Sequence, residues 1–313
     1  MTSNRLAVLG CWVVLLALEP VTRMSAGGAL ASDQELKQAT FQIGMGSRAF
    51  LNVNRNDAEA SFKVFINTAA KKRGYRIELV LSYFDTPTAF AAALTNQVTH
   101  LAAIDVWDYL DMNLGGFMEP RYILAKSGKP WQKYLLLTRS DSGLKSLADL
   151  RGKSIGLILA NNARMAMTWI EAQLMESQLG KAGEFFGRIE IVDKPTLAVL
   201  PVFFGKKQAC IVTQDGFAVM KELNPNVGRQ LVPLLASDEL TENIIFINTQ
   251  QWTPPELKND FLRAIDELHQ DPAGQQILRL FKADQAVPFR AEYLETMRKL
   301  KATVARRLDK GHP

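Results

Sequence analysis

The chain has 313 residues, of which 47% are hydrophobic and 22% charged, with a formal net charge of +5 at pH 7. This length suits two ordinary domains or one large one, and the composition excludes an intrinsically disordered chain. Much of the positive charge lies near the C-terminus, where we expect a solvated helix face whose cations interact favourably with the helix dipole.

The first 31 residues have the pattern of an export signal. Arg5 precedes an apolar run from Leu6 to Leu18, and the segment ends in Ala29-Leu30-Ala31, an Ala-x-Ala cleavage pattern. The apolar run is shorter than the roughly 20 residues that a membrane-spanning helix needs. We therefore expect a cleaved signal peptide at residues 1–31, a mature chain that begins at Ser32, and a periplasmic location. Export also argues against a nucleic-acid partner.

The sequence offers little that could carry catalysis. Cys11 lies in the leader, so cleavage leaves Cys210 as the single cysteine, in the apolar run Ala-Cys-Ile-Val that suits a small buried side chain. The histidines, His100, His269 and His312, are far apart and belong to no metal-binding spacing, and no nucleophile elbow is present. We predict no metal, no cofactor and no enzymatic activity.

The first part of the mature chain alternates between strand and helix patterns. Period-2 alternation predicts two strands, a short wholly apolar run predicts a third, and period-3.6 patterns predict two helices between them. The strands are Thr40 to Ser47, Arg76 to Tyr83 and Leu101 to Ile104; the helices are 57 to 72 and a segment through Phe90 to Leu94. Gly74 is placed to end the first helix, and Asp85 or Thr86 to cap the second.

A second pass of the same kind follows the polar crossover at residues 139–153. The predicted strands are Ser154 to Leu159, Ile189 to Val192 and Ala209 to Val212; the helices are Asn162 to Leu179, Leu197 to Phe204 and Gly216 to Leu223. Return strands at Leu231 to Leu235 and Ile244 to Ile247 precede helices at Pro254 to Leu268, Ala273 to Phe281 and Tyr293 to Leu308, the last expected to pack on the first lobe.

Two α/β passes of similar size predict two similarly built lobes, each a mostly parallel sheet flanked by helices, with a ligand cleft between them. Lobe I is expected to comprise 32–138 and 237–313, and lobe II 139–236. The chain is expected to cross between lobes near Thr138 to Asp141 and near Leu235 to Glu239, where small dihedral changes could close the cleft.

Four stretches carry a family resemblance: Ala92 to Ile104, the crossover Ser146 to Lys153, Leu200 to Val212, and the tail with Leu278 to Phe281 and Pro288 to Leu294. They resemble the phosphate/phosphite/phosphonate periplasmic solute-binding proteins of ABC importers, which have the type II periplasmic-binding-protein fold. The resemblance implies a monomeric, non-enzymatic protein that captures a small polar, phosphonate- or phosphate-like anion and delivers it to a membrane permease. A ligand sensor that signals to a membrane receptor or redox partner is the alternative.

The expected anion-binding turn departs from the family pattern. Ala160-Asn161-Asn162-Ala163-Arg164 replaces a turn rich in Ser and Thr, Asp193 to Thr196 occupies the region of the family's histidine, and Pro87 stands where a tyrosine is usual. Asn161 or Asn162 could still cap the following helix, and Arg164 could bind an anion through two donors. The resemblance therefore supports the binding role more strongly than phosphonate as the ligand.

Candidate ligand-binding residues follow from the rule that ligands lie beyond the C-terminal ends of parallel strands. In lobe I they are Ser47, Arg48, Tyr83, Thr86, Thr88, Asp105 and Trp107; in lobe II they are Asn161, Asn162, Arg164, Lys194, Thr196, Thr213 and Asp215. The basic members favour an anion, whereas Asp105 and Asp215 favour an amine or a zwitterion, and the sequence leaves both open.

Overall fold

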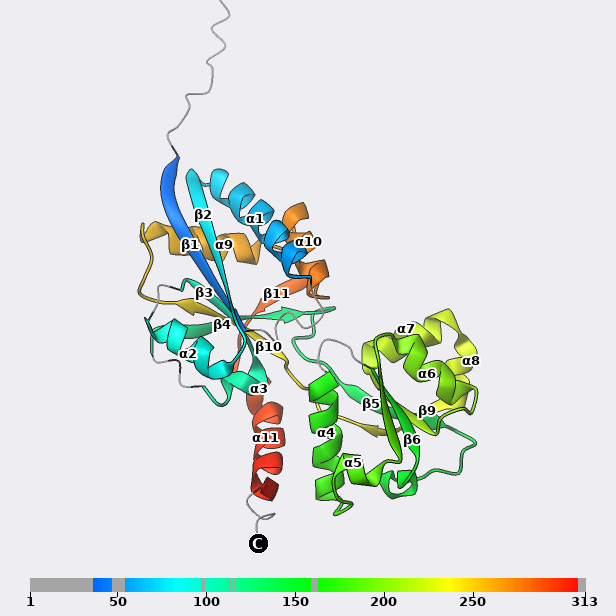
Figure 1. The fold of residues 1–313 in the computed structure, drawn as a ribbon. Coiled ribbons are helices and arrows are strands. Elements are labelled where there is room, and N and C mark those ends of the chain that lie inside the picture. Colours follow the sequence, from blue (N-terminus) through cyan, green and yellow to red (C-terminus); the bar gives the residue numbers. More distant parts are fainter. Residues whose placement is uncertain are drawn as a thin grey trace, which may run out of the picture. The chain divides into compact units, whose positions relative to one another are not determined.

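The computed structural model describes residues 36–46, 54–96, 99–112, 114, 116–158 and 163–308. Within these ranges the chain forms two β-sheets flanked by helices (Figure 1). The predicted signal peptide and its cleavage site lie outside the described residues.

The first sheet has six strands in the order β11-β4-β10-β3-β1-β2. Their bounds are β1 (Lys37–Gly46), β2 (Tyr75–Phe84), β3 (Leu101–Asp105), β4 (Met118–Ala125), β10 (Asn243–Asn248) and β11 (Gln285–Pro288). Strand β1 pairs in parallel with β2 and β3, whereas β10 is antiparallel to both β3 and β4, and β11 is antiparallel to β4. Strands β1 to β4 therefore share one direction, and β10 and β11 run the other way.

Helices cover both faces of this sheet because its strands are apolar on both sides. Figure 1 shows α1 (Arg55–Lys71), α9 (Glu256–Asp266) and α10 (Pro272–Leu280) together on one face. There Phe65 and Phe261 pack with Ile43 of β1. On the opposite face, Phe90 of α2 (Pro87–Asn96) packs with Ile104 of β3.

Local sequence determines where these helices begin and end. The Asn54 side chain accepts hydrogen bonds from the backbone N–H groups of Asn56 and Asp57 and so caps α1. Gly74 follows that helix with a φ of 82°, a left-handed conformation that glycine adopts without steric cost. Thr86 accepts a hydrogen bond from the backbone N–H of Ala89 and caps α2, which is one of the two predicted alternatives.

The second sheet has five strands in the order β7-β6-β8-β5-β9. They are β5 (Tyr134–Arg139), β6 (Ser154–Ile158), β7 (Arg188–Val192), β8 (Ala209–Thr213) and β9 (Leu231–Ala236). Strand β6 is parallel to β7 and β8, and β5 is antiparallel to β8 and β9. The flanking helices are α4 (Ala163–Glu176) and α5 (Ala182–Phe185), then α6 (Pro195–Phe203), α7 (Gln214–Leu223) and α8 (Pro225–Gln230).

The two sheets confirm the predicted α/β class, with most strands of each sheet running in one direction. Two details differ from expectation. Strand β4 was not predicted, and β5, which was assigned to lobe I, pairs with β8 and β9 of the second sheet. The division into lobes remains a prediction, and the pairing of β5 favours a first crossing between β4 and β5.

The terminal helix α11 (Glu295–Leu308) follows a short turn at Ala291–Leu294. It packs against α3 (Val106–Tyr109), next to the first sheet, and also against α4, next to the second sheet. One hydrophobic cluster accordingly contains Phe90 and Ile104 together with Leu136, Trp169 and Met297. The described parts of the two sheets thus share a buried contact region.

Candidate functional site

Asp105 stands at the C-terminal end of β3 and has only 6% of its surface exposed. Its Oδ1 atom accepts hydrogen bonds from the backbone N–H groups of Trp107 (2.9 Å) and Asp108 (3.3 Å). The carboxylate therefore caps α3, and its negative charge interacts favourably with the N-terminal end of that short helix. The position is the one predicted for a ligand contact in the first lobe.

Arg164, in the first turn of α4, faces this carboxylate from an element attached to the second sheet. Its Nη2 atom lies 3.4 Å from Asp105 Oδ1 and 3.4 Å from Asp108 Oδ1. The Arg164 side chain keeps 35% of its surface exposed, while those of the two aspartates keep 4% and 14%. A cation from one side thus meets two largely buried carboxylates from the other.

A second polar contact lies close by. Tyr134, 1% exposed, donates its hydroxyl hydrogen to Glu242 Oε1. Burial, the charge of Glu242 and that hydrogen bond, and the charge of Asp105 raise the pKa of Tyr134 well above its usual value. The phenol therefore stays protonated and acts as a hydrogen-bond donor at every physiological pH, and the charges of Glu242 and Asp105 both favour this protonated form.

Tyr134 also holds together two segments that connect the sheets. Its backbone N–H donates to Ser237 Oγ, and its carbonyl accepts from the backbone N–H of Ser237, both at 2.8 Å. Gln132 and Leu240 exchange backbone hydrogen bonds in the same ladder. The segment before β5 and the segment after β9 are consequently paired beside the polar groups.

A cavity of about 320 Å³, here called the cleft, lies between residues attached to the two sheets. The first sheet and its neighbours contribute Leu124, Lys126, Glu242, Asn243 and Phe281, and the second contributes Tyr134, Asp193, Thr213 and Asp215. Lys129, Trp131 and Gln132 of the connecting segment complete one wall. The volume and the mixture of aromatic and charged side chains suit a small polar ligand.

Thr213 and Asp215 enter the cleft because they begin α7. Thr213 Oγ1 accepts a hydrogen bond from the backbone N–H of Gly216 at 3.1 Å and caps the helix. Asp215 Oδ2 lies 3.4 Å from Lys126 Nζ, so a second ion pair joins the two sides of the cleft. Both residues were predicted from the end of the strand.

Thr86 lies in a separate hollow. With Asp105 and Asp108 it lines a space of about 10 Å³, at the lower limit for one water molecule. The structure therefore groups Thr86 with the two aspartates that contact Arg164, and the cleft residues Glu242 and Asn243 do not line this hollow.

The other candidates fall into two groups. Ser47, Arg48, Asn161 and Asn162 lie outside the described residues. Tyr83, Thr88, Trp107, Lys194 and Thr196 are described but do not line the cleft. Asp105 and Arg164, which contact each other, do not line it either. Trp107 instead packs beneath Lys301 of α11, whose Nζ atom is 5.2 Å from its ring centroid, and Arg55 stacks over the Tyr83 ring at 5.0 Å.

Four polar residues around Asp105 were not predicted: Asp108, Tyr134, Glu242 and Asn243. Asp108 follows Asp105 by three residues, a spacing that places both carboxylates at one helix start. Glu242 comes immediately before β10 and Asn243 is its first residue; this strand is antiparallel to its neighbours β3 and β4. The rule about strand C-termini therefore cannot find them, because an antiparallel strand brings its N-terminal end to the same edge.

In the part of the chain that the structure describes, no three His, Cys, Asp or Glu side chains gather in a way that could hold a metal ion. His100 does not take part in the cleft: its Nδ1 atom accepts a hydrogen bond from the backbone N–H of Gln42, and its ring stacks on Phe41. Burial lowers the pKa of His100 to about 4.

The family model of the phosphonate periplasmic substrate-binding proteins of ABC transporters matches residues 49–294, more than half of the chain. The chain belongs to this family. Its role is therefore that of a solute-binding protein for an importer, and membership favours this role over the sensing alternative. None of the curated proteins matches the chain.

Solved structures with the same fold share little sequence with this family member. XAC2383 from Xanthomonas citri bound to ATP superposes with a TM-score of 0.57 at 14% identity, over 87% of this chain and 99% of its own. PhnD1 from Prochlorococcus marinus in complex with methylphosphonate gives 0.53 at 13% identity, over 87% and 98%. A phosphonate-transporter binding protein, PA3383 from Pseudomonas aeruginosa, gives 0.51 at 13%, over 85% and 86%. These likenesses confirm the two-lobed α/β fold.

The family is one of periplasmic proteins that bind small molecules and work with an ABC permease. Among the described residues, no helix combines the length and the apolar character needed to cross a membrane.

Proposed function

We propose that this protein delivers to an ABC importer a small zwitterionic solute, one that carries an oxyanion and an ammonium group, and that it binds this solute between the two lobes. The observation that carries the proposal is the contact of Arg164 with Asp105 and Asp108, at 3.4 Å each. Both signs of charge are present at one point where elements of the two sheets meet.

Charge balance favours a zwitterion over a simple anion. An anion that bound Arg164 would draw the guanidinium away from Asp105, whose side chain is only 4% exposed. Depriving a buried charge of an ionic partner costs several kcal/mol, on the order of 3–5. A ligand ammonium group that takes the place of Arg164 at Asp105, while the ligand oxyanion binds Arg164, restores both pairs. Glu242 adds a second carboxylate for the ammonium group.

A phosphonate is the oxyanion that we propose. The family consists of substrate-binding proteins of phosphonate ABC transporters. PhnD1, which has the same fold, was solved in complex with methylphosphonate. A guanidinium presents donors in a fixed planar fork that matches the oxygens of a phosphonate group. Ser47, Arg48, Asn161 and Asn162 are proposed as further ligand contacts, since they follow the strands that lead to this place.

Binding is proposed to close lobe I on lobe II through the paired segments at Gln132 to Tyr134 and Ser237 to Leu240. Closure would surround the solute and form the surface that the permease recognises. We further propose that the chain acts as a monomer, without catalysis or a cofactor, after export and removal of residues 1–31.

Calorimetric titration tests the proposal. Aminomethylphosphonate is expected to bind at least about tenfold more tightly than methylphosphonate, phosphate or phosphite, because it alone restores both ion pairs. Arg164→Gln and Asp105→Asn are each expected to weaken its binding about 30-fold or more. Arg188→Gln, an exposed arginine of β7, is the control and should bind as the unaltered protein does. Tighter binding of the simple anions would overturn the zwitterion, and no binding of any oxyanion would overturn the phosphonate class.

A further inference from the structure

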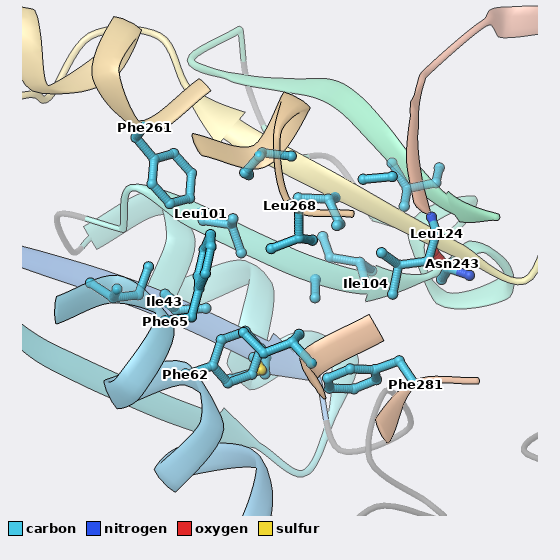
Figure 2. Close-up of a pocket in the computed structure, with 18 of the residues that line it drawn as sticks. Ile43, Phe62, Phe65, Leu101, Ile104, Leu124, Asn243, Phe261, Leu268 and Phe281 are labelled. Carbon is cyan, nitrogen blue, oxygen red and sulfur yellow. The ribbon is translucent and has the colours of Figure 1, made fainter. Parts of the chain in front are cut away.

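A second cavity, here called the apolar chamber, lies inside the first lobe between the sheet and helices α1, α9 and α10. Figure 2 shows Phe62 and Phe65 of α1, Phe261 of α9 and Leu268, just after α9, converging on it together with Ile43 and Leu101 of the sheet. The chamber has a volume of about 170 Å³ and is lined almost throughout by aliphatic and aromatic side chains.

This volume is large for a protein core, in which voids bigger than a water molecule are few. Apolar walls offer water no hydrogen-bond partners, and an apolar cavity of about 150 Å³ in another protein stays dry and accepts benzene. Phe62, Ala103, Leu124 and Phe281 keep part of their surface exposed although they belong to the hydrophobic core. An apolar group of benzene size would cover these surfaces and restore their lost dispersion contacts.

The chamber adjoins the cleft. Leu124, Glu242, Asn243 and Phe281 line both spaces. Asp105, the carboxylate that meets Arg164, also lines the chamber. In Figure 2 Asn243, Leu124 and Phe281 lie at one end and Phe261 at the other. The chamber is therefore apolar along its length and polar only where it approaches the charged groups of the cleft.

We infer that the solute carries an apolar substituent of up to about six carbons, which occupies this chamber while its charged groups stay at Asp105, Glu242 and Arg164. The inference rests on the proposed function, because it uses the same charged groups. The solute class is then a 1-aminoalkylphosphonate or 1-amino-arylalkylphosphonate, in which ammonium and phosphonate share one carbon and the substituent branches from it.

A homologous series tests the inference with the head group held constant. Dissociation constants are measured by calorimetry for aminomethylphosphonate and for its 1-ethyl, 1-propyl, 1-butyl and 1-hexyl side-chain homologues. Burial of each added methylene is expected to raise the affinity about fourfold. The gain is expected to cease near six carbons, where the substituent fills the chamber, and a 1-phenyl analogue should bind as tightly as the 1-butyl homologue or more so.

Variants that fill the chamber locate the effect. Ala103→Leu on β3 and Ala286→Leu on β11 each add three carbons to its wall. In either variant the dissociation constants of aminomethylphosphonate and of its 1-butyl homologue are expected to become nearly equal. Two positions are used so that one poorly folded variant does not decide the result. Ala302→Leu, on the exposed side of α11, is the matched control and should leave the whole series as in the unaltered protein.

The outcomes separate this inference from the proposed function. If all homologues bind equally, or if affinity falls with chain length, the chamber does not receive the substituent, while the zwitterion proposal stands. Long homologues could bind more tightly while the chamber variants show the same gain in affinity per added carbon as the unaltered protein. The alkyl substituent would then lie elsewhere, and the inference would be overturned. If aminomethylphosphonate and every homologue fail to bind, both the proposed function and the inference are wrong.

Discussion

At the scale of single residues, Asp105 performs two tasks that can be separated. Its Oδ1 atom caps α3 through two backbone N–H groups, and the same atom faces Arg164. A cap requires only an acceptor oxygen, whereas the ion pair requires a charge. The stability of the helix and the proposed binding of solute therefore depend on different properties of one side chain.

Replacement of Asp105 by Asn and by Ala should separate these tasks. Asn retains an acceptor oxygen, so Asp105→Asn should keep the cap and lose the charge. Asp105→Ala should lose both and be less stable than the Asn variant by about 1 kcal/mol, the usual contribution of a helix cap. Urea denaturation of both solute-free variants measures the difference. Equal stabilities would mean that the cap contributes nothing here.

His100 shows how burial, without a charged partner, determines a protonation state. It is 4% exposed, packs between Phe41 and Trp252, and accepts a hydrogen bond from Gln42 through Nδ1. Desolvation lowers its pKa from 6.5 to about 4, so the folded protein keeps the ring neutral where the unfolded chain would protonate it.

A loss of stability in mild acid follows. Since the unfolded chain binds the proton more tightly, the contribution of His100 is complete above pH 6.5 and declines as the pH falls towards about 4, by about 3 kcal/mol in total. His100→Asn keeps an acceptor for Gln42 but cannot titrate, so its denaturation free energy should fall less over that interval. His269→Asn, at an exposed position, is the control. If the denaturation free energy of the His100 variant fell with pH as steeply as that of the unaltered protein, the acid sensitivity would belong to other groups.

The sequence could indicate the place of a residue in the fold where that residue follows a parallel strand, while its contact with a ligand stays a prediction. Asp105, Thr213 and Asp215 were found because β3 and β8 end there, and Arg164 because it begins the helix after β6. Glu242 and Asn243 were not predicted, because β10 runs antiparallel to strands that lie far from it in the sequence, and its direction cannot be inferred locally. Tyr134 was not predicted, because in the sequence it resembles the other apolar residues of its strand. The residue that accepts its hydroxyl hydrogen bond, Glu242, is 108 residues distant.

At the scale of elements, the sequence predicts strands and helices well when one period dominates. Strand β4, Met-Glu-Pro-Arg-Tyr-Ile-Leu-Ala, has Pro120 and two charges in its first half, which obscure the pattern. Strand β5 is buried along most of its length, and such a run carries no information about which sheet it joins. Its partners β8 and β9 come much later in the chain, so its sheet could not be assigned locally.

The turn between α9 and α10 gives a test at this scale. A Cβ atom on Gly274, near the start of α10, would lie 2.2 Å from the carbonyl oxygen of Leu268, so the two segments approach more closely than any other residue permits. Gly274→Ala should therefore lower the free energy of unfolding by about 1–3 kcal/mol, the usual cost of overpacking.

Gly183→Ala is the matched control, because Gly183 in α5 has open space where a Cβ atom would lie. It should be neutral or slightly stabilising, since alanine favours the helix by up to about 1 kcal/mol. Thermal unfolding of both variants measures the contrast. If Gly274→Ala were as stable as the control, α10 would have room to shift, and the wall that it gives to the apolar chamber would be adaptable.

At the scale of the whole molecule, α11 has a more specific place than its sequence suggested. Its basic face predicted a solvated surface and packing on the first lobe. The helix does pack next to the first sheet, where Lys301 donates from Nζ to the carbonyl of Trp107 at 3.0 Å and pairs with Asp111 at 2.6 Å. A contact with α4, next to the second sheet, was not predicted: Thr303 donates to Glu176 of that helix at 3.3 Å. Helix α11 thus contacts α3 and α4, the two helices whose first residues carry the Asp105, Asp108 and Arg164 contact.

Substitution of Lys301 should loosen α3 without unfolding the protein. Lys301→Met keeps an apolar stem over Trp107 but removes the bond to its carbonyl and the pair with Asp111, which together contribute about 1 kcal/mol. Hydrogen exchange of residues 106–112 should accelerate about fivefold, because α3 has few other contacts, while exchange in β1 and β8 stays constant. Lys299→Met, at an exposed position of the same helix, should change neither. Unaltered exchange at 106–112 would show that the cap at Asp105 alone positions the carboxylates, so that α11 holds α4 but not α3.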